Sequence, residues 1–593
     1  MLVLSAGFCG LAAALQPSKP VPPAPRAEPH RSPVDLAIVP GGRRALTANQ
    51  TSDSASLVDL RAGTVLAEVA CGHKPAAVAC SRDGRRAAVS NLWSGTVTLL
   101  EVGETALKPV AQVAVGSLPR GLAFAADGKS LYVAVADEVV QVDWDSRKIE
   151  QRWPAAREPR QVVLSADGRW LAAASSRSGQ IRCWSTATGK LHWERKIEDA
   201  FNLRGLAFTP DGKGLVCAHN IRREFPVSKA NIEEGWVIDS RLTWLSLDRD
   251  QGPLLRQIAL DTRGQAVGDP YGLAFSPDGR RLAVTGSGTH ELLLLETTAI
   301  PWNAGDPGDV MDPRLKAGRD EFRRLRLGGR PLTVVLAGKD AEAVVANYLL
   351  DAVQVVVIKS GNLRTIPLGS PAHPSPARRG EALFYDAGRA HDQWFSCNTC
   401  HVEGHTCGLT FDTLNDDSYG NPKLTPTLRN VARTGPWTWH GWQKSLPAAV
   451  EKSMTQTMFG PRPSAEQARD LVGFLETLDD PPNPNAGPGG AVTAVRRGRT
   501  IFRGKGGCAR CHRGKDYTSP RNYDVKLEPD GSPYRLWNPP SLRGLIDRGP
   551  YLHDGRAATL EDVVQKDHSP EKLGGQALTA QEGHDLIAFL KSL

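Results

Sequence analysis

The chain has 593 residues, of which 40% are hydrophobic and 23% charged, proportions that are ordinary for soluble globular proteins. This length exceeds what a single hydrophobic core usually organises, so three or more domains are expected. The formal net charge of +8 is modest and no long basic run occurs, which argues against nucleic-acid binding.

The N-terminus has the pattern of an export signal. Residues 1–18 are mostly apolar and end near three alanines (12–14) that suit cleavage, and the Pro-rich residues 19–32 resemble a linker. Two features depart from the usual signal: no Lys or Arg precedes the apolar run, and Phe8 stands before Cys9, where a lipid-anchored protein carries a small residue. We expect a periplasmic or otherwise exported protein with no integral membrane segment after signal removal, since no later stretch is apolar for long enough to span a bilayer.

Residues 33–371 carry an internal repeat. A turn signature recurs as "PGGR" at 40, "SRDGR" at 81, "AADGK" at 125, "SADGR" at 165, "TPDGK" at 209 and "SPDGR" at 276, with "LAGKD" at 336 as a degenerate seventh copy. Short apolar strands flank each copy, and the Asp-Gly pair suits a tight hairpin in which both central residues have positive φ. Repeats of about 40 residues built in this way are typical of propeller blades. We predict an all-β seven-bladed propeller similar to the bacterial YVTN-type propellers, a scaffold that by itself names no activity.

The spacing of the repeat lengthens twice, within residues 218–270 and 300–325. Long insertions in a propeller usually leave from one face. Two interpretations stay open: decoration of that face, or a rim for docking or substrate binding.

Two C-x-x-C-H motifs follow the repeat: Cys397, Cys400 and His401, then Cys508, Cys511 and His512. Two thiols three residues apart on a helical turn can each add to a vinyl group of haem, and the adjacent His then supplies the proximal nitrogen to the iron. A zinc knuckle is the alternative, but its four-ligand site needs a second Cys/His pair that neither copy shows. We expect two covalently bound c-type haems.

The other cysteines show no regular spacing, so a disulfide scaffold is not indicated. Four of them lie in strand-like runs and are expected to be buried small hydrophobes, namely Cys71, Cys80, Cys183 and Cys217. Cys407 is expected to be a free thiol or one half of an unidentified pair.

The two motifs lie in two copies of one domain. Residues 426–454 and 540–568 align without a gap at an offset of 114, an opening helix repeats at 378 and 496, and a closing helix repeats at 464 and 579. Each closing helix begins with a capping box, formed by Ser464 with Gln467 and by Thr579 with Glu582. We predict two mainly α cytochrome c-type domains, residues 376–480 for haem one and 494–593 for haem two, joined by the linker 481–493.

The stretches "RRGEALFYDAG", "SCNTCHVEGHTCGLTFD" and "GPYLHDGRAATLEDVV" resemble the bacterial di-haem cytochrome c peroxidase family, which includes the di-haem maturase of methylamine dehydrogenase. The resemblance covers residues 376–593. It implies a periplasmic two-domain protein in which one haem meets peroxide and the other relays electrons.

The second axial ligands are less evident from sequence. The offset of 114 pairs Met454 with His568, which falls where the family's relay haem carries its distal ligand, commonly Met; His in that place should lower the haem potential. For haem one, Met454 and Met458 lie within five residues of each other in a chain with only four Met. Either is a distal candidate, and packing against a haem face is the alternative. His405 is a further candidate, for which a loop hydrogen bond is the simpler role.

The family's peroxidases place a Glu beside the peroxide, and here Thr457 stands in that place. Thr exchanges protons poorly at neutral pH, so peroxidase activity should be weak unless His440 or Glu451 substitutes. Trp439 belongs to an aromatic cluster that either packs a haem or, as the family implies, bridges the two haems as an electron relay.

The sequence therefore predicts an exported fusion of a propeller with a di-haem oxidoreductase of the cytochrome c peroxidase type. Its partner would be a redox protein or a small oxidant such as peroxide, and the propeller would serve as a docking or substrate-binding scaffold. The alternative is a non-enzymatic electron-transfer cytochrome that the propeller docks to its partner.

Overall fold

The computed structural model describes residues 30–248, 254–318, 320–338, 341–370, 373–486, 492–528 and 533–593. The predicted export signal and most of the Pro-rich linker lie outside the described residues. Within the described residues, no helix combines the length and the apolar character that crossing a lipid bilayer requires.

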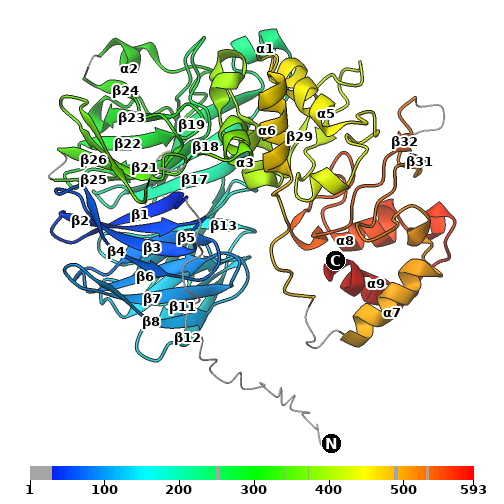
Figure 1. Cartoon of the computed structure of the whole chain (residues 1–593), viewed down its shortest axis with the longest axis horizontal. Helices are drawn as coiled ribbons and strands as arrows, with labels where there is room; N and C mark the ends of the chain where they lie inside the picture. The colour runs from blue at the N-terminus through cyan, green and yellow to red at the C-terminus, as the bar shows by residue number, and fades with distance from the viewer. Residues whose placement is uncertain are drawn as a thin grey trace, which may run out of the picture.

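The N-terminal part is a seven-bladed propeller, as predicted. Seven antiparallel four-stranded sheets follow one another in the described residues, each made of consecutive strands. Strand β1 packs beside β5 of the second blade and β25 of the seventh, which closes the ring. Figure 1 shows the blades in blue to green, with the C-terminal part of the chain, in yellow to red, beside them.

The strands of the seven blades, in chain order, are β1 (Pro33–Val39), β2 (Arg44–Asn49), β3 (Ser54–Asp59) and β4 (Thr64–Ala70); β5 (Pro75–Cys80), β6 (Arg86–Asn91), β7 (Thr96–Val102) and β8 (Leu107–Ala114); β9 (Leu122–Phe124), β10 (Ser130–Val135), β11 (Glu138–Asp143) and β12 (Ile149–Pro154); β13 (Pro159–Leu164), β14 (Trp170–Ser175), β15 (Gln180–Ser185) and β16 (Leu191–Lys196); β17 (Ala200–Phe208), β18 (Gly214–Arg222), β19 (Ile238–Ser246) and β20 (Leu255–Ala259); β21 (Pro270–Phe275), β22 (Arg281–Gly286), β23 (Glu291–Glu296) and β24 (Phe322–Arg326); and β25 (Pro331–Ala337), β26 (Glu342–Asn347), β27 (Ala352–Val357) and β28 (Leu363–Pro367).

The Asp-Gly turns differ from the prediction. Only the glycine of each pair has positive φ, as at Gly84 (71°), because a five-residue loop rather than a two-residue one joins the strands. The Gly84 N–H donates to the Ser81 carbonyl at 2.9 Å, and Asp83 accepts from the Ser81 hydroxyl at 2.6 Å and the Arg85 N–H at 3.0 Å. The aspartate thus holds the turn by accepting hydrogen bonds rather than by adopting a left-handed backbone.

The C-terminal part contains two segments with the same order of elements, here called the first CxxCH segment (residues 376–480) and the second CxxCH segment (residues 492–593). Their helices are α3 (Pro376–Phe384), α4 (Cys397–Cys400), α5 (Leu446–Lys452) and α6 (Ala465–Leu475) in the first, and α7 (Val492–Arg503), α8 (Leu560–Asp562) and α9 (Ala580–Lys591) in the second. Short strand pairs accompany them, β29 (Thr410–Phe411) with β30 (Lys423–Leu424) and β31 (Tyr523–Asp524) with β32 (Leu536–Trp537).

In each segment the opening helix packs against the closing helix, α3 on α6 and α7 on α9. Gly380 and Gly498 lie at the two crossings, where an added Cβ would overlap a backbone carbonyl of the closing helix. The predicted capping boxes at the start of α6 and α9 are both present. Helix α7 begins at Val492, two residues before the predicted boundary, and residues 487–491 of the linker lie outside the described part.

The first insertion in the propeller packs on the first CxxCH segment. It forms helix α1 (Lys229–Glu233), the Val227 N–H donates to the Asp412 carbonyl at 2.7 Å, and Ile232 joins an apolar cluster with Phe384 and Met454. The second insertion, which carries helix α2 (Pro313–Ala317), is tied to the first by Asp309, which accepts from Arg223 at 2.6 Å and from the Trp236 indole at 3.0 Å. The first insertion therefore forms a contact surface inside the molecule, and the docking or substrate-binding role of the insertions stays a prediction.

Candidate redox site

The first CxxCH motif forms a single helical turn, α4, which places both thiols next to His401. The His401 N–H is 2.9 Å from the Cys397 carbonyl, and its Nδ1 pairs with the Pro426 carbonyl at 2.9 Å, which leaves Nε2 for a metal. Burial lowers the pKa of His401 to about 4. The imidazole is therefore neutral, which is the form that ligates iron.

A carboxylate of the propeller holds this turn. Asp269 lies just before β21 and is only 2% exposed. It accepts hydrogen bonds from the Ser396 hydroxyl at 2.6 Å, the Thr399 hydroxyl at 2.7 Å and the Asn398 amide at 3.3 Å. Sequence reasoning missed Asp269, because nothing in its local pattern points to a motif that lies 130 residues further along the chain.

A cavity of about 470 Å³ adjoins this motif, and its residues fit a c-type haem. Cys397, Cys400 and His401 line it together with many apolar side chains. Arg548 also lines it, and the Nε and Nη2 atoms of this buried guanidinium have no hydrogen-bond partner in the described part of the chain. These groups match the parts of a haem. The thiols suit its vinyl groups, the free imidazole nitrogen its iron, the apolar walls its ring, and the unsatisfied cation its carboxylates.

Met454 and Met458 are both buried and both line this cavity. The Met458 sulfur lies 3.9 Å from the Cys397 sulfur. A π-helical turn, Ser453–Thr457, precedes Met458, and a second one, Val563–Asp567, precedes His568. Counted from these turns, Met458 corresponds to His568, so the predicted pairing of Met454 with His568 does not hold. Helix α5 is one turn longer than α8, which breaks the constant offset.

The second CxxCH motif has an imidazole on each side of the space that an iron would take. The His512 Nδ1 pairs with the Tyr517 carbonyl at 3.1 Å, which again leaves Nε2 free. The ring centre of His568 lies 6.5 Å from that of His512. Two imidazoles on one metal, with bonds of about 2 Å, place their ring centres roughly 6 Å apart. Burial also lowers the pKa of both rings, that of His568 to about 4.

No carboxylate lines the cavity at the first motif, among the residues described. Thr457 lines it, and so do His440 and Trp439. Glu451 does not; it pairs with Arg462 at 3.1 Å instead. Of the two substitutes considered for the missing Glu, only His440 is therefore at the cavity.

His440 belongs to a stack of rings that crosses between the two CxxCH segments. Its ring lies between Trp442, at 4.5 Å, and Trp537, at 4.2 Å, and Trp537 stacks on His553 at 3.7 Å. The His440 Nδ1 pairs with the Leu536 carbonyl at 3.0 Å, whereas its Nε2 is buried without a partner in the described part. Sequence reasoning identified the aromatic cluster of the first segment but missed Trp537, which no motif marks.

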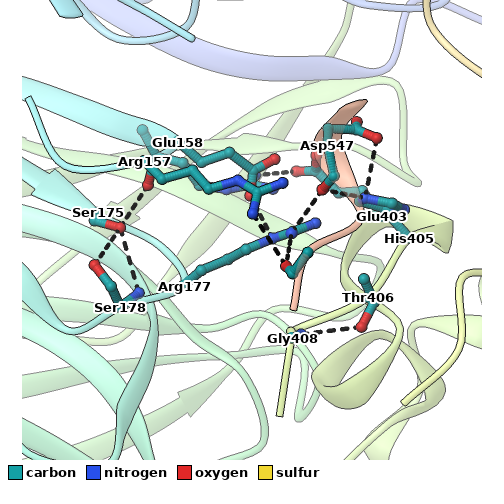
Figure 2. Close-up of polar contacts among 12 residues, drawn as sticks. Arg157, Glu158, Ser175, Arg177, Ser178, Glu403, His405, Thr406, Gly408 and Asp547 are labelled. Carbon is teal, nitrogen blue, oxygen red and sulfur yellow. Dashed lines mark hydrogen bonds and ion pairs between the residues drawn. The ribbon is translucent and has the colours of Figure 1, made fainter. Parts of the chain in front are cut away.

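The propeller also clamps the junction of the two segments (Figure 2). Arg177 pairs with Glu158 at 2.7 Å and donates to the carbonyl of Asp547 in the second segment at 2.7 Å. His405 of the first segment reaches the same carbonyl at 3.2 Å through Nε2, and its Nδ1 pairs with Thr427 at 2.8 Å. Both nitrogens of His405 are thus engaged in loop hydrogen bonds, which is the simpler role that the sequence allowed.

The cysteines outside the motifs are free thiols in the described part of the chain. Cys71, Cys183 and Cys217 are buried, as predicted, whereas Cys80 is half-buried. Cys407 is buried near the first motif, and burial raises the pKa of its thiol.

Comparisons with known proteins extend these observations. The family model "WD domain, G-beta repeat" matches residues 157–185, within the fourth blade. The chain is 27% identical over 288 residues to methylamine utilization protein MauG of Methylorubrum extorquens, across 38% of this chain and 80% of that protein. It is 26% identical over 289 residues to cytochrome c551 peroxidase of Nitrosomonas europaea, across 39% of this chain and 83% of that protein.

A solved structure, Kuenenia stuttgartiensis hydrazine synthase, is similar with a TM-score of 0.51 and 24% identity, across 56% of this chain and 97% of that chain. This match supports the fold alone. The matches to MauG and to the cytochrome c peroxidase confirm the predicted resemblance to the di-haem family, and the repeat match fits a propeller fused to it.

Proposed function

We propose that this chain is an exported di-haem oxidoreductase of the cytochrome c peroxidase type, built from a propeller and two mainly α cytochrome c-type domains. The observation that carries the proposal is the asymmetry of the two motifs: His512 faces His568 at 6.5 Å, whereas the first cavity offers His401 and two thioethers. Covalently bound haem supplies one-electron transfer and, at a weakly held iron, peroxide activation. Haem one is the proposed reactive site and haem two the proposed relay.

The role proposed for the propeller is to hold the two haem domains in a fixed arrangement. Asp269 anchors the first motif, and Arg177 joins the junction where His405 and Asp547 meet. Because these contacts are buried, a small displacement of either domain would leave charged groups without partners. Trp439 and the adjacent ring stack contact residues of both haem domains. The family resemblance implies that electrons would pass between the haems through such a tryptophan.

Two covalent haems per chain are expected. Thiols at Cys397, Cys400, Cys508 and Cys511 should form thioethers, which survive denaturation. The haem colour should remain with the protein through denaturing electrophoresis, and mass spectrometry should find the mass of the processed polypeptide plus two haems. A gain of one haem or none would refute the two-domain assignment.

Peroxide turnover is expected to be slow, and Thr457→Glu is expected to raise it. The cavity has no carboxylate among its described lining residues, so the proton-accepting role of the family's Glu would fall to His440, a ring held in a stack between Trp442 and Trp537. Adding a carboxylate should raise the peroxide-dependent rate about tenfold or more, since well-positioned general acid–base groups contribute roughly 10²–10⁴-fold. Thr457→Gln serves as the matched control, since it has similar size without the acid. Equal rates in both variants would contradict the alignment of Thr457 with the family's Glu.

The second candidate is an electron-transfer cytochrome without catalytic activity, and the same missing carboxylate favours it. Cyanide titration of the oxidised and half-reduced protein separates the two proposals. Binding at one haem supports the oxidoreductase, because an enzyme of this type must present an exchangeable iron position. Binding at neither haem would leave the carrier.

A further inference from the structure

A second cavity of about 470 Å³ lies between the centre of the propeller and the first CxxCH segment. Its walls come from the inner strands β1, β5, β13, β17, β21 and β25 and from helix α3 with the chain that follows α6. The volume is that of sites for small molecules. We call this cavity the central chamber; it contains neither CxxCH motif.

The central chamber is lined by more cations than anions. Seven cationic side chains face four acidic ones among the lining residues: Lys74, Arg120, Arg160, Arg204, Arg330, Arg378 and Arg429 against Asp35, Glu381, Glu403 and Asp479. Buried charges are normally paired. A cation of the chamber that lacks a carboxylate partner is therefore a candidate to bind an anionic ligand.

Four of the cations have carboxylate partners. Arg120 and Arg160 both pair with Glu403, at 3.3 and 2.7 Å. Arg378 pairs with Glu381 at 2.8 Å, and Arg429 pairs with Asp547, outside the chamber, at 2.6 Å. The Arg120 and Arg160 contacts join the propeller to the first CxxCH segment, and none of the four cations needs a ligand to be paired.

The other three cations have none. Arg204 is 2% exposed, and all three nitrogens of its guanidinium lack a hydrogen-bond partner in the described part of the chain. Arg330 is 3% exposed, and its Nε lacks one too. Burial lowers the pKa of the Lys74 ammonium to about 8. Desolvated donors of this kind are costly unless something accepts their hydrogen bonds.

Aromatic rings hold these cations in place without satisfying their N–H groups. The Arg204 guanidinium lies 5.0 Å from the Tyr271 ring, Arg330 lies 3.4 Å from the Tyr385 ring, and the Lys74 amine lies 3.5 Å from the Trp93 ring. Cation–π contacts fix where a guanidinium lies but accept no in-plane hydrogen bond. The donors are thus positioned in advance around a space of ligand size.

We propose that the central chamber binds a small organic oxyanion, a carboxylate or phosphate compound, through Arg204 and Arg330 with Lys74 contributing charge. Guanidinium groups bind such anions bidentately, and the flat aromatic walls accept the carbon part of the ligand. If the chamber holds only water, neither anion tested below should bind to it saturably.

Calorimetric titration of the full-length holoprotein tests this, with inorganic phosphate and succinate as separate probes at constant chloride. One saturable site per chain is expected for at least one probe, and which probe binds identifies the phosphate or the carboxylate class. Arg204→Gln and Arg330→Gln should each weaken binding at least tenfold, and Arg204→Lys should weaken it less, because it keeps the charge. Arg280→Gln is the matched control; Arg280 lies exposed in a turn at the far end of β21, away from the chamber, and should not alter binding.

Thermal unfolding supplies an independent measurement if a variant folds poorly. Without added anion, Arg204→Gln should raise the melting temperature, because it removes an uncompensated buried charge. With saturating anion, the wild type should gain stability and the variant should not. Absence of saturable binding to either probe, or equal binding by wild type and both Gln variants, would overturn the proposal.

Discussion

Replacing His568 by methionine is expected to raise the reduction potential of one haem by on the order of 100 mV or more, since axial ligands tune haem over about 0.8 V. The His568 ring lies 6.5 Å from that of His512, a spacing that suits a metal held between them. Methionine ligation favours the reduced iron relative to histidine, so the sign of the shift is positive. Spectroelectrochemical titration with resolved haem signals measures it, and the other haem should scarcely move.

His584→Met provides the control for this substitution. His584 is exposed on α9 in the same segment, so the chemical change is identical but away from the motif. Its potentials should match those of the wild type. Unchanged potentials in His568→Met itself would show that His568 is not an axial ligand.

Asp269→Ala is expected to destabilise the attachment of the haem-one domain by roughly 3 kcal/mol or more, because each buried donor that loses its acceptor costs about 1–3 kcal/mol. Three side-chain donors of the first motif, from Ser396, Asn398 and Thr399, would lose their shared acceptor, which is 2% exposed. Denaturant unfolding followed by haem absorbance, together with limited proteolysis, measures the loss.

Asp167→Ala is the matched control, because Asp167 also accepts from a serine hydroxyl, that of Ser165, but in a turn at the protein surface. Its cost should stay within about 1 kcal/mol, as for other surface substitutions. Equal losses in the two variants would contradict the anchoring role of Asp269.

Much of the architecture could be predicted from local signals. Each blade is built from consecutive strands, so a repeating turn signature was enough to predict the seven-bladed ring. The capping boxes at Ser464 and Thr579 lie within one helical turn, and both formed as predicted. The thiols and imidazole of each CxxCH motif are likewise neighbours in sequence, which is why the predicted helical turn is present at the first motif.

The register of the distal ligands could not be predicted in this way. A gapless offset assigned Met454 to the place of His568, but the extra turn of α5 moves that place to Met458. A gapless alignment of two segments does not reveal that one helix is a turn longer, because residues missing later in the same segment restore nearly the same offset. The prediction that both residues of each Asp-Gly pair have positive φ was wrong for a related reason. The length of the loop, rather than the residue pair, selects the turn type.

The sequence by itself determined the repeat, the two CxxCH motifs and the duplicated helices, because each depends on residues that are close together in the chain. Only the tertiary structure decided what surrounds them. Asp269 meets Thr399 across 130 residues, Arg177 meets Asp547 across 370, and the unpaired cations of the central chamber converge from separate blades. Hydrogen bonds and ion pairs between distant segments leave no spacing pattern in the sequence, since folding rather than chain connectivity brings their atoms together.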